Sequence, residues 1–111
     1  MPKTAPMCSE ASSEVFRLDA VELVRRLRAR ELSCVELMEA TLKRIDALNP
    51  TFNAIVAIRD RDELLAEAKA KDSGPAGGAL FGLPLAVKDL AAARGMRMTM
   101  GSPLLERFVP S

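Results

Sequence analysis

The residue with the clearest chemical potential is Lys88, which follows a run of mostly apolar residues from Gly82 to Val87. Such a run is typical of a strand buried on both faces, with the lysine at its end. A lysine amine in apolar surroundings without an opposite charge favours its neutral form, which is a base. Asp89 is adjacent, but its side chain would point to the opposite face of a strand. The pattern therefore marks Lys88 as a candidate proton acceptor.

The same lysine has a plain structural interpretation, in which it marks the solvent end of the strand and extends its ammonium into water. The composition limits the kinds of catalytic and metal site that the chain can form. The chain has no histidine and two cysteines, Cys8 and Cys34, so it lacks Ser-His-Asp and Cys-His catalysis and the common metal sites. We expect both cysteines to be free thiols in a reducing compartment, and no metal or cofactor.

Length and charge indicate a single soluble domain. The chain has 111 residues, with 16 basic and 15 acidic side chains and a formal charge of +1. This balance gives no general attraction to nucleic acid or membranes. No apolar stretch is long enough to cross a bilayer, and the first residues do not form a secretory signal. We expect a cytoplasmic protein with a disordered leader over residues 1–15 and one domain over residues 16–111.

Two helix starts share a pattern in which a capping residue is followed three positions later by glutamate, as in a capping box. The pairs are Asp19 with Glu22 and Ser33 with Glu36. With the apolar spacing that follows each cap, they predict helices over residues 20–30 and 34–48. The second helix is expected to end at Asn49-Pro50, because the residue before a proline avoids helical geometry.

Two short apolar runs, residues 52–58 and 83–87, predict strands. A third helix, capped by Asp60 or Asp62 and ending near Lys71, separates them. The order helix, helix, strand, helix, strand predicts an α/β layered fold. Two strands cannot cover the edges of such a sheet. We therefore interpret the chain as a truncated part of a larger fold, with an exposed sheet edge that favours a homodimer or other self-association.

Several segments, taken in order, resemble the amidase signature hydrolases. These segments are Glu31–Leu37, Arg44-Ile45, Asn49–Ala54, Leu80–Asp89, and Gly95 with Thr99–Ser102. The resemblance covers about residues 18–108, and Leu80–Asp89 is similar to the segment that delivers the catalytic lysine of the family. It implies that residues 16–111 are the N-terminal portion of a single amidase domain, with an α/β/α layered fold and a mixed sheet.

The resemblance also implies a chemistry. The family hydrolyses carboxamides with a triad of serine, cis-serine and lysine, in which the lysine takes a proton through the second serine and returns it to the leaving amine. Carried over, Lys88 is the triad lysine, and both triad serines are expected beyond Ser111. The complete protein would act on a small-molecule amide without a metal or cofactor, and the chain alone is expected to be inactive.

Two other functions stay open. One, within the same family, is the A subunit of a glutamyl-tRNA(Gln) amidotransferase, which supplies ammonia to a misacylated tRNA and needs partner subunits. No residue of the chain separates this possibility from a stand-alone amidase. The other is a small helical interaction module without enzymatic activity. It would bind a partner through the apolar stripes of the first two helices, which hold Leu23, Leu27, Val35, Met38 and Leu42.

Overall fold

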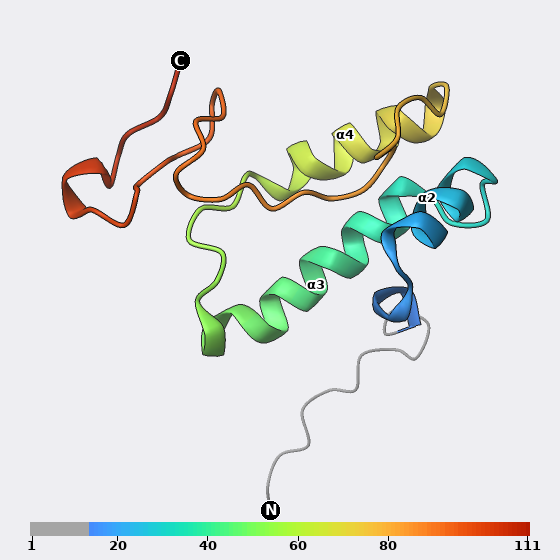
Figure 1. Cartoon of the computed structure of the whole chain (residues 1–111), viewed down its shortest axis with the longest axis horizontal. Coiled ribbons are helices and arrows are strands. Elements are labelled where there is room, and N and C mark those ends of the chain that lie inside the picture. The colour runs from blue at the N-terminus through green and yellow to red at the C-terminus, as the bar shows by residue number, and fades with distance from the viewer. Residues whose placement is uncertain (1–13) are drawn as a thin grey trace, which may run out of the picture.

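The computed structural model describes residues 14–111, so residues 1–13 of the expected leader, with Cys8, lie outside the described residues. The helical elements are η1 (Val15–Arg17), α2 (Ala20–Arg28), α3 (Cys34–Phe52), α4 (Arg61–Ser73) and η2 (Pro103–Leu105). Helices α3 and α4 pack on each other, α2 lies beside the start of α3, and the chain after α4 returns along the helices as a loop (Figure 1). The part of the chain that carries Lys88 is therefore irregular.

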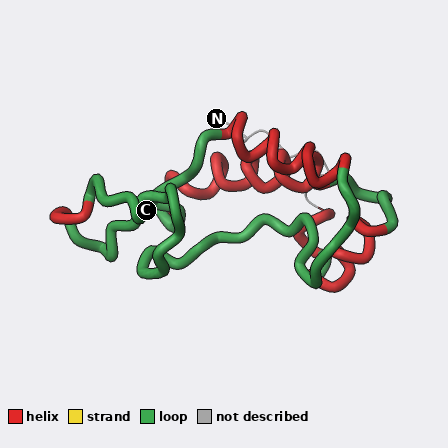
Figure 2. The backbone as a smooth tube through the Cα atoms, turned by 90° about the horizontal axis from the view of Figure 1, so that it is seen from above, coloured by secondary structure: helices red, strands yellow, loops and turns green. Residues whose placement is uncertain are grey.

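The expectation of an α/β layered fold with a mixed sheet is wrong, because residues 14–111 contain no β-strand. Residues 52–58 form the end of α3 and an irregular connector, and residues 83–87 lie in a long loop (Figure 2). Both runs are apolar, but a strand also needs a neighbouring strand to pair its backbone groups. Neither run pairs in this way within the described chain. The expected sheet edge for self-association is therefore absent from these residues.

The helix caps predicted from the sequence are confirmed at the starts of α2 and α3. The backbone N–H of Glu22 donates to Asp19 Oδ1 at 2.8 Å. In α3 the capping box is complete, since Glu36 N donates to Ser33 Oγ at 3.0 Å and Ser33 N donates to Glu36 Oε2 at 2.8 Å. The Glu22 carboxylate instead binds two arginines of its own helix. Helix α2 therefore has the cap without the full box.

The predicted end of α3 is wrong, because the helix continues through Asn49 and Pro50 to Phe52. Pro50 lies in the last turn, so the backbone hydrogen bond that it cannot donate is lost close to the end of the helix. The Asn49 side chain binds both backbone groups of Ile55, donating to its carbonyl and accepting from its N–H, each at 2.9 Å. Asn53 then ends the helix in the left-handed conformation, with φ 47°.

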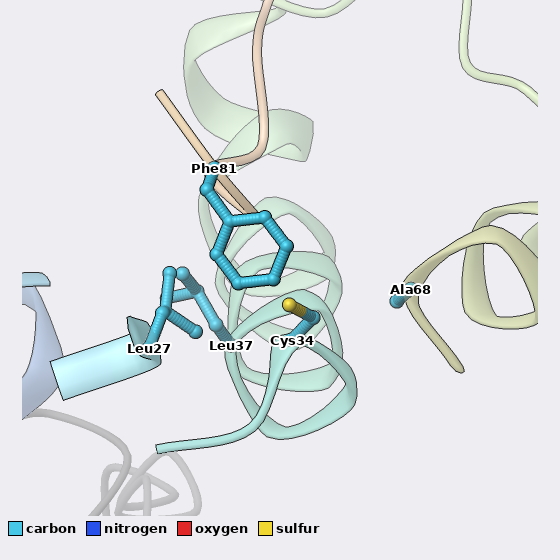
Figure 3. Packing of buried hydrophobic residues seen from close by; sticks show 5 residues of the cluster. All are labelled: Leu27, Cys34, Leu37, Ala68 and Phe81. Carbon is cyan, nitrogen blue, oxygen red and sulfur yellow. The ribbon is translucent and has the colours of Figure 1, made fainter. Parts of the chain in front are cut away.

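A small hydrophobic core lies where the three α-helices meet the loop after α4 (Figure 3). Its buried members are Leu27, Cys34, Leu37, Ala68 and Phe81. The Phe81 ring lies against Leu27 and Cys34, so the returning loop is fastened to the helices at this point. No residue after Phe81 is a buried hydrophobic in the described chain. The core therefore supports the start of the segment that leads to Lys88, and not its end.

The molecule is flat and open, with principal extents of 49 × 44 × 24 Å. Its radius of gyration is 15.9 Å, against about 13 Å for a compact domain of similar length. Figure 1 shows that the C-terminal segment extends beyond the ends of the helices. Among the described helices, none combines the length and the apolar character needed to cross a membrane.

Candidate active site

Lys88 lies in the loop between the core and η2, and its side chain is exposed. The sequence predicted a buried strand leading to this lysine, and within residues 14–111 neither the strand nor the burial is present. The flanking Val87 is also 39% exposed. The apolar cover that would favour a neutral amine is therefore not supplied by the described residues. The catalytic role of Lys88 stays a prediction.

Gly82 lies where the chain leaves the core and leads toward Lys88. Its φ of +73° lies in the left-handed region, which side chains other than glycine adopt at a steric cost. A Cβ at this position would lie 2.6 Å from Cys34 Sγ and 3.2 Å from Leu27 Cδ1. Both the backbone conformation and the close approach require glycine. The sequence pattern indicated Gly82 only as the start of a strand and gave no sign of this role.

Cys34, at the start of α3, is free, as the sequence predicted, and the structure shows that it is also buried. Burial, together with the neighbouring Asp72 carboxylate, raises the pKa of its thiol to about 11. The thiolate is the reactive form of cysteine. Cys34 therefore packs the core beneath Gly82 and is not a nucleophile.

Asp72, in the last turn of α4, caps the first turn of α3. Its Oδ1 accepts from Cys34 N at 2.8 Å, and its Oδ2 accepts from Val35 N at 3.2 Å. Partial burial opposes ionisation of Asp72, but the two N–H groups, the Cys34 thiol and the Arg30 charge together outweigh it, and the pKa of the carboxyl is lowered. Asp72 thus joins two helices at the core that supports Gly82.

Two arginines tie the connection between α2 and α3 to the loop after α4. Arg30, with a left-handed φ of 59°, donates to the carbonyls of Asp72 and Gly74 at 3.1 and 2.8 Å. Arg28 donates to the carbonyl of Gly78. The Arg30 guanidinium also lies 5.7 Å from the centre of the Phe81 ring. These contacts hold the loop in place before it reaches the candidate site.

Beyond Lys88, Asp89 binds the turn at Thr99. Its carboxylate accepts from Thr99 N at 2.8 Å and from the Thr99 hydroxyl, and its backbone carbonyl accepts from Met100 N at 3.2 Å. The hydrogen bonds from Thr99 lower the pKa of Asp89. We call this set of contacts the Asp89 clamp. The sequence pattern placed Asp89 on the face opposite to Lys88 and gave it no partner, so the clamp was missed.

The clamped segment is a tight turn over residues 99–102, closed by a hydrogen bond of 2.9 Å from Ser102 N to the Thr99 carbonyl. Its central residues, Met100 and Gly101, have φ values of 51° and 71°. Ser102 Oγ accepts from Leu104 N at 3.3 Å and so caps η2. The Ser102 hydroxyl therefore has a structural role at the start of η2.

Two open depressions of the described chain, of about 510 and 550 Å³, are lined by residues other than Lys88. The first lies at the end of α3, beside Asn49 and Arg61, and the second lies between the start of α4 and residues 94–96. Within residues 14–111, no three His, Cys, Asp or Glu side chains gather as a metal site requires. The site is thus one exposed amine beside a clamped turn.

This lysine and its clamped turn both fall inside residues 36–111, which match the family model described as Amidase. The chain belongs to the amidase family. It is 46% identical over 91 residues to the glutamyl-tRNA(Gln) amidotransferase A subunit of Chromobacterium violaceum, covering 79% of this chain and 19% of the relative. The corresponding protein of Geobacter metallireducens is 42% identical over 100 residues, covering 87% of this chain and 20% of the relative.

The chain therefore spans about one fifth of the length of the curated relatives that it matches. No solved structure matches it. The family resemblance drawn from the sequence is confirmed.

Proposed function

We propose that the chain is the lysine-bearing part of a glutamyl-tRNA(Gln) amidotransferase A subunit, with Lys88 as the catalytic base. The observation that carries the proposal is the position of Lys88 directly before the Asp89 clamp, inside the matched Amidase region. Both relatives, from Chromobacterium violaceum and Geobacter metallireducens, carry the name of this amidotransferase. This support favours the amidotransferase over a stand-alone amidase, which is the second candidate.

In the proposed reaction the neutral Lys88 amine accepts a proton, relayed by one serine, from the hydroxyl of a second serine. That serine attacks the carbonyl of the amide donor, and the C–N bond breaks as Lys88 returns the proton to the departing ammonia. Water then releases the carboxylate from the acyl-serine. The ammonia passes to the glutamyl-tRNA(Gln), whose side-chain carboxylate must first be activated by phosphoryl transfer from a nucleoside triphosphate, so that phosphate leaves as the amide forms. Ser102 does not serve as the nucleophile, because its hydroxyl caps η2.

A base of this kind needs apolar cover that favours its neutral form. The described residues leave Lys88 exposed, and the chain spans about a fifth of its relatives. We infer that further segments of the protein, or its partner subunits, cover the lysine and supply the serines. The helical interaction module is disfavoured, since the family assignment points to amide chemistry.

The test uses the full protein that carries this chain, together with its partner subunits, and compares Lys88→Ala with the unchanged protein. Two rates are measured: ammonia released from glutamine, and the conversion of glutamyl-tRNA(Gln) to glutaminyl-tRNA(Gln). Loss of a catalytic base is expected to lower kcat by about 10²- to 10⁴-fold. Lys69→Ala, an exposed lysine of α4 far from the site in sequence, is the matched control.

If Lys88→Ala leaves both rates within two-fold of the unchanged protein, the catalytic role is wrong. The two candidate enzymes separate on the second rate. An amidotransferase requires glutamyl-tRNA(Gln) as acceptor, whereas a stand-alone amidase cleaves simple carboxamides and leaves the tRNA unchanged.

A further inference from the structure

We propose that Asp89 is a positioning residue that acts through Lys88, because the clamp fixes the backbone at Lys88 against the turn over residues 99–102. The inference rests on the proposed function, since it assigns Asp89 to the same site. It adds a residue whose side chain does not touch the reacting atoms. Its role would be to hold the lysine where the proton transfer takes place.

The clamp contacts both the side chain and the backbone of Asp89. Thr99 donates twice to the carboxylate, through its N–H at 2.8 Å and through its hydroxyl. Met100 N donates to the Asp89 carbonyl at 3.2 Å. The Thr99 hydroxyl also accepts from Gly101 N at 3.3 Å, so it links the carboxylate to the far side of the turn. These contacts hold the turn in a fixed position relative to Asp89, in addition to the hydrogen bond that closes the turn.

The turn itself is held in a conformation that Met100 disfavours. A φ of 51° is in the left-handed region, where a side chain with a Cβ crowds the following carbonyl. Gly101, at φ 71°, meets no such cost. Residues in such conformations persist where the surroundings hold them, and they gather at functional sites. The Asp89 clamp is the set of contacts that keeps Met100 in this left-handed conformation.

Lys88 is held by its backbone and not by its side chain. Its carbonyl accepts from Ala91 N at 2.9 Å, and the next residue carries the clamp. The chain beyond the turn is also tied back, since Met98 N donates to the Phe108 carbonyl at 3.0 Å. The Lys88 amine is exposed, so the placement of its backbone decides the region it can reach.

This arrangement predicts which kinetic constant the clamp controls. Proton transfer needs the donor and acceptor within hydrogen-bond reach, and a misplacement of about 1 Å can cost about 10²-fold in rate. The Asp89 carboxylate and the Thr99 hydroxyl are hydrogen-bonded to each other within the clamp, so neither group is expected to bind the substrate. Loosening the clamp should therefore lower kcat and leave KM nearly unchanged.

The first experiment breaks the clamp in the full protein with its partner subunits, with ammonia release from glutamine as the readout. Thr99→Val removes the hydroxyl and keeps the shape, and it is expected to lower kcat at least ten-fold with KM within about three-fold. Thr99→Ser keeps the hydroxyl and should retain kcat within about three-fold. Asp89→Ala should show the same split between kcat and KM as Thr99→Val.

The second experiment restores the turn without restoring the clamp. Met100→Gly adopts the left-handed conformation without steric cost, so the double variant Thr99→Val/Met100→Gly should recover at least a third of the lost activity. Met100→Ala is the matched control, because it also removes the long side chain but keeps the Cβ that opposes the turn. Thr99→Val/Met100→Ala should recover no activity.

The outcomes separate this inference from the proposed function. If Lys88→Ala retains activity, the proposed function fails and the clamp has no base to position. If Lys88→Ala is inactive while Thr99→Val keeps its kcat, only the positioning role fails. The positioning role also fails if KM rises with unchanged kcat, or if glycine and alanine at position 100 rescue equally. If Thr99→Val does not fold, the test uses Thr99→Ser and Asp89→Asn instead. The variant that retains more of the clamp hydrogen bonds must then have the higher kcat.

Discussion

The Asp72 carboxylate accepts the backbone N–H of Cys34 at 2.8 Å, so the last turn of α4 closes the first turn of α3. The two residues are far apart in the sequence, and no local pattern pairs them. The contact is made directly beneath Gly82, whose Cβ would collide with the Cys34 sulfur. The helix pair and the loop that carries Lys88 therefore depend on the same small region.

The Asp72 cap predicts a measurable loss of stability. Asp72→Ala removes acceptors from two N–H groups at the start of α3, and loss of such a cap costs about 1–2 kcal/mol. Urea unfolding of the chain, followed by helical circular dichroism, measures the effect. Glu39→Ala, an exposed acid on the same helix, should change the free energy of unfolding by less than about 0.5 kcal/mol. Equal losses in the two variants would contradict the capping role.

Acid should weaken the same cap. The pKa of Asp72 is lowered from an unfolded value near 3.8, so below pH 4 the unfolded chain binds a proton that the folded chain does not. Stability is therefore fully present above pH 4 and falls as the pH drops through the lowered value. Hydrogen bonds from Arg25 and Arg26 also lower the pKa of Glu22, from 4.5 to about 2.

The measurement is urea unfolding at a series of pH values from 6 to 2. Asp72→Asn removes the titrating group, so its difference from the unchanged chain should shrink as the pH falls below 4. Glu39→Gln is the control and should follow the unchanged chain throughout. A constant difference between Asp72→Asn and the unchanged chain at every pH would show that the carboxylate charge is not what matters.

Gly82 predicts a position-specific cost for one methyl group. Gly82→Ala combines a left-handed φ of +73° with a contact of 2.6 Å to Cys34 Sγ. The backbone part costs about 1–2 kcal/mol, and the added atom in a packed core costs about 1–3 kcal/mol more. Thermal unfolding measures the sum.

Gly77→Ala is the matched control, because a Cβ there meets nothing within 4 Å. It should be neutral or slightly stabilising. In the double variant Gly82→Ala/Cys34→Ala the collision with the Cys34 sulfur is relieved. The backbone cost of Gly82→Ala and the tight contact with Leu27 Cδ1 at 3.2 Å stay, measured against Cys34→Ala alone. If Gly82→Ala is as stable as Gly77→Ala, the close packing at Gly82 is wrong.

The Cys34 thiol should be inert in the folded protein. It is 2% exposed, and burial raises its pKa to about 11, so little thiolate forms at neutral pH. In a Cys8→Ser background, labelling by iodoacetamide should rise only as urea unfolds the chain and should follow the loss of helix. Rapid labelling without denaturant would contradict the burial of this residue.

The sequence predicted the parts of the structure that depend on near neighbours. Asp19, Ser33 and Asp60 cap their helices as expected, because a capping side chain bonds to backbone groups two or three residues away. The strand over residues 83–87 failed for the opposite reason. Its apolar run indicates burial, but strand formation depends on a pairing partner that a local pattern does not contain.

In the candidate site, too, the sequence predicted what depends on near neighbours and missed what depends on distant residues. Lys88 was found from its position after an apolar run and from the family resemblance, whereas the Asp89 clamp joins two residues ten positions apart. A sequence signal for the clamp does exist, since Thr99 is followed by Met-Gly-Ser and glycine favours a tight turn there. That signal predicts the turn, but it does not name the carboxylate that the turn binds.

Arg28 and Arg30 hold the end of α4 and the loop after it through the carbonyl oxygens of Asp72, Gly74 and Gly78, and Arg30 also lies over the Phe81 ring. Every amino acid supplies a carbonyl, so the hydrogen bonds themselves do not depend on the side chains at their acceptor residues. Substitutions at these acceptor positions should thus be tolerated wherever the path of the backbone is kept, whereas loss of either guanidinium group removes the donors that hold it.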